Sequence, residues 1–162
     1  MKRCILMLLI VNASILFSQE EYSTRFWANA GLGFNSMTIG LNVNANLNID
    51  NVLLTLKFSE YGEILGNSFR ETGCLVGYVM PSSNSHLSIA GGFAEGEYNK
   101  SRGGILAGTD KISYFGFITE LQYCYLIWDF LGVGATMYGN INKAKNVFGV
   151  NFNLFIGSLN RK

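Results

Sequence analysis

The sequence predicts an all-β protein: an eight-stranded antiparallel up-and-down transmembrane β-barrel. Apolar and polar residues alternate at period two in eight segments, which is the spacing of β-strands whose two faces meet different surroundings. The polar faces carry Asn, Gly, Thr and Ser instead of Lys and Glu, so they suit an enclosed interior better than bulk water. The apolar faces then point outward, as in membrane barrels with an apolar band about 25 Å tall.

The first two strands show the alternation most clearly. Residues 25–35 place Trp27 and Asn29 on the face opposite Phe26 and Ala28. Residues 37–49 read M-T-I-G-L-N-V-N-A-N-L-N-I, in which every second residue is apolar. We expect the polar face of this second strand to line the interior through a ladder of Asn42, Asn44, Asn46 and Asn48.

The third, fourth and fifth strands follow at residues 52–59, 71–80 and 87–97. The third places Thr55 and Lys57 on the inward face. The fourth has apolar residues on both faces, so its parity stays open. The turn residues at 81–85 separate it from the fifth strand, in which Ile89 and Phe93 share the outward face.

The last three strands are expected at residues 112–126, 131–141 and 147–157. Phe115, Phe117 and Leu121 align outward on the sixth strand, which leaves Glu120 and Gln122 inward. The seventh strand turns Thr136 and Tyr138 inward. The eighth repeats the pattern, with Gly149, Asn151 and Asn153 on its inward face.

The lengths of the connections suggest which end of the barrel faces outward. If both termini are periplasmic, the turns at 50–51, 81–86 and 127–130 are periplasmic as well. The connections at 60–70 and 98–111 are then extracellular, and these are the longest two, as expected for such barrels. The other outer connections, near residues 35–38 and 142–146, are tight.

Only Lys57 and Glu120 place charges well inside strands, whereas other charges, Glu71 among them, fall at strand ends or in loops. We predict that Lys57 and Glu120 approach each other across the lumen, directly or through water; two separately solvated charges are the alternative. Such a pair would act as a plug, because side chains fill the interior of an eight-stranded barrel. The expected polar network is structural and comprises Lys57, Glu120, Asn42, Asn44, Asn46, Thr55, Gln122 and Tyr138.

The N-terminus predicts export. Lys2 and Arg3 precede a run of about 14 largely apolar residues, which is typical of a secretory signal peptide and too short for a spanning helix. We expect a signal peptide at 1–18, a periplasmic segment at 19–24, the barrel at 25–157 and a tail at 158–162. The exact cleavage site stays open.

Composition narrows the possible functions. Charged residues are 14% of the chain, below the roughly 25% of ordinary soluble domains. Without Lys2 and Arg3 the charge is nearly balanced, and no basic patch suggests a nucleic acid. The sequence lacks a Cys/His metal cluster and a phosphate loop, so we expect no cofactor. Cys74 and Cys124 are expected to be buried free thiols, although an oxidising compartment permits a disulfide.

His86-Leu87-Ser88 resembles the catalytic pair of the outer-membrane lipid A deacylases, because H-x-S spacing puts imidazole and hydroxyl on one strand face. The acid that orients the histidine would have to be Glu95 or Glu97, roughly 25 Å or more along the same strand. His86 is also expected at the periplasmic rim, beside a turn. We therefore predict that the protein is not an enzyme.

Over residues 25–157 the chain resembles the small eight-stranded outer-membrane β-barrel class, with a signal peptide like those of Bacteroidota or related Gram-negative bacteria. The resemblance implies an outer-membrane location, contact with outer-membrane lipid and a monomer. It also implies an envelope-structural or surface-interaction role through the loops at 60–70 and 98–111, with an extracellular protein or surface ligand as partner. The alternatives are a narrow channel, a lipid-modifying enzyme, or a soluble lipocalin-like ligand-binding barrel.

Overall fold

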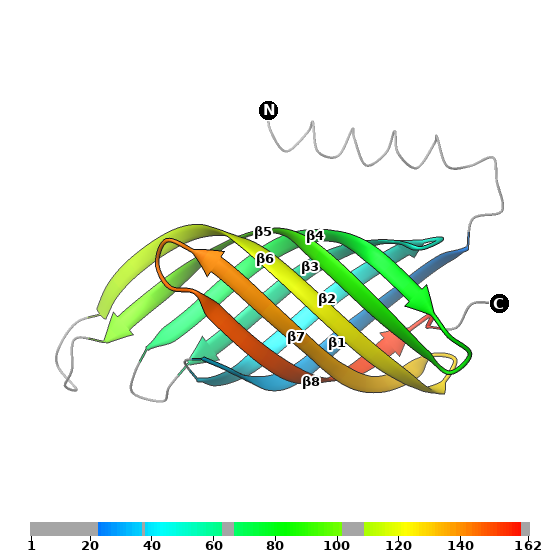
Figure 1. The fold of residues 1–162 in the computed structure, drawn as a ribbon. Helices are drawn as coiled ribbons and strands as arrows, with labels where there is room; N and C mark the ends of the chain where they lie inside the picture. Colours follow the sequence, from blue (N-terminus) through cyan, green and yellow to red (C-terminus); the bar gives the residue numbers. More distant parts are fainter. Residues whose placement is uncertain (1–22, 37, 63–66, 102–108, 160–162) are drawn as a thin grey trace.

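The computed structural model describes residues 23–36, 38–62, 67–101 and 109–159, which form a closed antiparallel barrel (Figure 1). Each strand pairs with its neighbours in the sequence, and β8 closes the barrel onto β1. The predicted fold class is confirmed. The strands are β1 (Thr24–Asn35), β2 (Ile39–Ile49), β3 (Val52–Gly62), β4 (Ser68–Pro81), β5 (Ser85–Ser101), β6 (Thr109–Trp128), β7 (Leu131–Asn142) and β8 (Val147–Gly157).

The apolar face of every strand points outward. On β1, Phe26 is 57% exposed whereas its neighbour Trp27 is 1% exposed, and the same alternation continues around the barrel. A soluble barrel of lipocalin type would turn its apolar face inward, so that alternative is wrong. Among the described residues, no helix is long and apolar enough to cross a membrane.

The barrel has two different ends. The terminal end carries the start of β1, the end of β8 and the short turns after β2, β4 and β6; the hairpin end carries the other connections (Figure 1). Tyr78, Tyr123, Tyr125 and Trp128 are exposed toward the terminal end. Such aromatic side chains with a polar group are typical of the membrane interface.

The hairpins β3–β4 and β5–β6 are longer than predicted. The expected loop at 60–70 begins inside β3 and finishes inside β4, and the one at 98–111 is shortened in the same way by β5 and β6. The strands continue because Tyr61, Phe69, Tyr98 and Tyr114 keep the inward parity and are buried. Residues 63–66 and 102–108 lie outside the described residues, as do residues 1–22 with the predicted signal peptide.

The structure settles the parity of β4. Glu71, Leu75 and Val79 are buried inside, whereas Cys74 faces outward and is exposed. Cys124 is buried on the inner face of β6, so the barrel wall separates the two thiols and both are free. The expectation that both cysteines are buried is therefore wrong for Cys74.

An apolar cluster fills the lumen toward the terminal end. Its large members include Trp27 and Phe155, and it also contains Leu159 from beyond the last strand. The Leu159 side chain is 1% exposed, and its backbone N–H donates to Asp129 O at 3.1 Å. The segment predicted as a tail therefore contributes to the core at Leu159.

Candidate functional site

Lys57 on β3 and Glu120 on β6 form an ion pair across the lumen. Lys57 Nζ lies 2.6 Å from Glu120 Oε2, and both side chains are almost completely buried. The ammonium group also lies 4.1 Å from the ring centroid of Tyr138. This distance allows a cation–π contact in addition to the ion pair.

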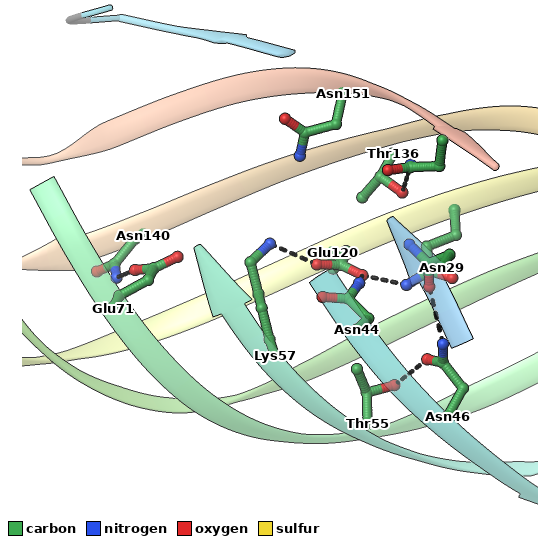
Figure 2. A network of polar contacts seen from close by, with 12 residues as sticks. Asn29, Asn44, Asn46, Thr55, Lys57, Glu71, Glu120, Thr136, Asn140 and Asn151 are labelled. Carbon is green, nitrogen blue, oxygen red and sulfur yellow. Dashed lines mark hydrogen bonds and ion pairs between the residues drawn. The ribbon is translucent and has the colours of Figure 1, made fainter. Parts of the chain in front are cut away.

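The second oxygen of the Glu120 carboxylate is also occupied. Asn44 Nδ2 donates to Glu120 Oε1 at 2.8 Å, and Gln122 Nε2 donates to the same oxygen. A buried ion pair is stable only when further hydrogen bonds satisfy the remaining lone pairs, and here two amides do so. Hydrogen bonds and the ion pair thus join four of the predicted network residues in one cluster, of which Figure 2 labels Lys57, Glu120 and Asn44.

The asparagine ladder forms a second cluster beside the ion pair. Asn46 Nδ2 donates to Asn29 Oδ1, and Thr55 Oγ1 donates to Asn46 Oδ1, both at 2.8 Å (Figure 2). Asn42 shares the inward face but makes no such bond to the described residues. The predicted residues therefore divide into two bonded groups. Asn42 lies outside both, and Tyr138 joins the first group only through the contact of its ring with Lys57.

Two further charges lie in the lumen, so the prediction of only two interior charges is wrong. Glu71 is 0% exposed, and its Oε2 accepts hydrogen bonds from Asn140 Nδ2 and, at 3.4 Å, from Tyr114 OH. Arg25 is also buried, and its Nη2 donates to Asn48 Oδ1 at 2.6 Å. Glu71 was missed because β4 is apolar on both faces, and Arg25 because it begins the first predicted strand.

Aromatic side chains close the lumen toward the hairpin end. The rings of Tyr61 and Tyr138 stack with centroids 5.8 Å apart, and those of Phe69 and Tyr114 stack at 5.3 Å. Tyr61 OH also donates to Asn151 Oδ1 at 2.8 Å. Three groups of side chains therefore fill the lumen: the apolar cluster, the polar residues around Lys57 and Glu120, and this aromatic cap.

His86 lies directly after the β4–β5 turn, at the terminal end, as predicted, but its side chain points into the barrel. It is buried, and its ring centroid lies 5.1 Å from that of Trp27 and 6.1 Å from that of Phe155. Neither His86 nitrogen has a hydrogen-bond partner among the described residues, and the same holds for Ser88 Oγ. The H-x-S motif therefore does not form an assembled dyad.

Metal ligands are also not clustered: within the described ranges, no group of three or more His, Cys, Asp or Glu side chains could hold a metal ion. The lumen groups that are brought together are an ion pair, amides, hydroxyls and aromatic rings. Such an arrangement fills space and pairs the charge of Lys57 with that of Glu120.

The closed barrel, its apolar outer face and its polar, filled interior define the class of the small eight-stranded outer-membrane barrels. This fold and this outer face support a location in an outer membrane. The apolar band is the surface that such barrels turn toward lipid.

Solved structures of that class share the fold. The N-terminal β-barrel domain of Pseudomonas aeruginosa OprF is 11% identical, with a TM-score of 0.67 over 85% of this chain and 99% of that one. Neisserial surface protein A is 12% identical, with a TM-score of 0.63 over 87% and 100%. Ail, the attachment invasion locus protein of Yersinia pestis, is 12% identical, with a TM-score of 0.57 over 85% and 98%. No family model and no curated protein matches the sequence.

Proposed function

We propose that the protein is a non-enzymatic outer-membrane barrel that acts as an envelope scaffold and interacts with extracellular partners through the tips of β3–β4 and β5–β6. The observation that supports this most is the filled lumen. The ion pair of Lys57 and Glu120, the aromatic cap and the apolar cluster together occupy the interior. A solute path through the barrel would have to displace side chains of all three groups.

The outer surface of the two long hairpins also favours this role. Their outward positions near the hairpin end are charged, with ion pairs between Arg70 and Glu60 at 2.9 Å and between Lys111 and Glu97 at 2.6 Å. These pairs are substantially exposed, and a charge on the lipid face is costly. Both hairpins are therefore suited to stand in water beyond the apolar band, where loops commonly carry function.

The environment of His86 argues against a lipid-modifying activity. The imidazole packs against Trp27 and Phe155 on the lumen side of the wall, so the wall separates it from lipid. A lipid ester would have to enter the apolar cluster to reach the imidazole. This environment supports the part of the proposal that the protein has no enzymatic activity.

Planar-bilayer conductance and a tip-replacement variant test the proposal. The variant carries Gly-Ser residues in place of 63–66 and 102–108, and the probe is immobilised heparin, because Ail has been crystallised with the heparin analogue sucrose octasulfate. We expect no current from the intact barrel and a loss of probe binding by cells that display the variant. A steady current through the intact barrel would contradict the proposed role. So would equal binding to heparin of cells that display the intact barrel and cells that display the variant.

A further inference from the structure

A hollow of about 360 Å³ lies on the outer face of the barrel where β5, β6 and β7 approach the hairpin end. The apolar residues that line it are Phe93, Phe115, Phe117 and Ile141. The Phe93 ring stacks on Phe115 at 5.4 Å and meets the edge of Phe117 at 5.8 Å between centroids. These contacts give the hollow a fixed aromatic wall at the edge of the apolar band that lies toward the hairpin end.

A cation lies at the rim of this hollow. Lys143, in the turn between β7 and β8, is exposed and lines it, and no carboxylate is among the lining residues that the structure describes. The turn is held by Asn142, whose Oδ1 accepts the backbone N–H groups of Ala144 and Lys145, both at 2.8 Å. Asn142 Nδ2 also donates to Lys145 O at 2.8 Å. The position of Lys143 is therefore set by the turn.

Lys145, two residues further on, points elsewhere. Its ammonium group lies 5.9 Å from the ring centroid of Tyr98, whose side chain is buried on the inner face of β5. The same turn thus carries one lysine that lines the hollow and one that does not. This difference provides a matched control.

We propose that the hollow binds a phosphorylated glycolipid of the lipid A type, with acyl chains on the aromatic wall and a phosphate on Lys143. The apolar wall matches the chains, and the ammonium group matches the phosphate. From β5 to β7 the hollow spans two inter-strand spacings, about 10 Å, so acyl chains of the lipid have room to lie side by side. The assignment to the outer leaflet rests on the orientation in the proposed function, in which the hairpin end faces outward.

Native mass spectrometry of the refolded, detergent-solubilised barrel tests this site. The probes are diphosphorylated lipid A, the same lipid after removal of its phosphates, and phosphatidylglycerol. We expect Lys143→Gln to weaken binding of diphosphorylated lipid A about tenfold, as for the loss of one charge-assisted hydrogen bond, and Lys145→Gln to leave it unchanged. Removal of the phosphates should abolish the difference between the two variants.

A second variant tests the apolar part of the site. Ile141→Ala should weaken binding of both forms of lipid A, whereas Ile39→Ala, an equally exposed outward position on β2, should not. Equal effects of the two lysine variants, or binding of phosphatidylglycerol as tight as that of lipid A, would overturn the assignment. Because binding is measured on the folded barrel in detergent, the result does not depend on whether the hairpin tips bind an extracellular partner.

Discussion

Lys57 and Glu120 meet across the interior of the barrel, with Nζ and Oε2 2.6 Å apart, although 63 residues separate them in the sequence. Both carboxylate oxygens of Glu120 are occupied, one by the ammonium group and the other by amides from Asn44 and Gln122. The pair therefore connects β3 to β6 across the lumen of the barrel.

Lys57→Met should destabilise the barrel strongly, because it leaves the Glu120 carboxylate buried without its cation. Removal of one partner of a buried ion pair costs about 3–5 kcal/mol. The urea midpoint for loss of the heat-modifiable gel band measures the change. Arg70→Gln, which breaks an exposed pair with Glu60, should cost no more than about 1 kcal/mol. Similar midpoints for the two variants would show that the interior pair contributes little.

Leu159→Ala should destabilise the barrel although the residue follows the last strand. The side chain is buried in the apolar cluster, and truncation of a buried leucine costs about 2–5 kcal/mol. Leu154→Ala provides the control, because Leu154 is 45% exposed on the outward face. The same urea titration compares them, and an unchanged midpoint for Leu159→Ala would mean that this segment does not close the lumen.

The two cysteines should differ in reactivity. A small lipid-soluble mercurial should modify Cys74, which is exposed on the outer face, and leave the buried Cys124 unmodified until urea unfolds the barrel. Peptide mapping by mass spectrometry identifies each adduct, and Cys74→Ser should lack the adduct of the folded state. Modification of Cys124 in the folded barrel would contradict the closed interior.

Loss of the Tyr61–Tyr138 stack from the aromatic cap should not open a pore. With Tyr61 and Tyr138 both changed to Ala, the ion pair and the apolar cluster still fill the lumen. Planar-bilayer recordings of this variant should therefore match those of the intact protein. A current that appears with the double substitution would show that the remaining side chains of the interior do not seal the lumen.

Much of the barrel could be predicted from the residue pattern within single strands. The alternation in residues 37–49 predicted that the Asn ladder faces inward, because the side chains of a strand point alternately to its two faces. The same parity placed Lys57 and Glu120 inside. Parity could not show which residues of β4 face inward, because apolar side chains occupy both of its faces. Glu71 was therefore expected at a strand end, whereas its side chain is buried in the lumen.

The length of the long hairpins also required the tertiary structure. Glu60 and Arg70 read as loop residues, yet they are paired in β3 and β4. Tyr61 and Phe69 beside them bury their rings in the lumen, and this packing extends the strands. A local pattern of charged residues cannot show that the residues between them have a core to pack against.

By itself, the sequence determined the inward and outward faces of every strand but β4 and the polar character of the interior, because both depend on alternation within single strands. Only the tertiary structure decided that Lys57 reaches Glu120, that Leu159 closes one end and that His86 lies among Trp27 and Phe155. Contacts across a barrel depend on how the strands are staggered when the sheet closes. That stagger is a property of all eight strands together, and no single segment encodes it.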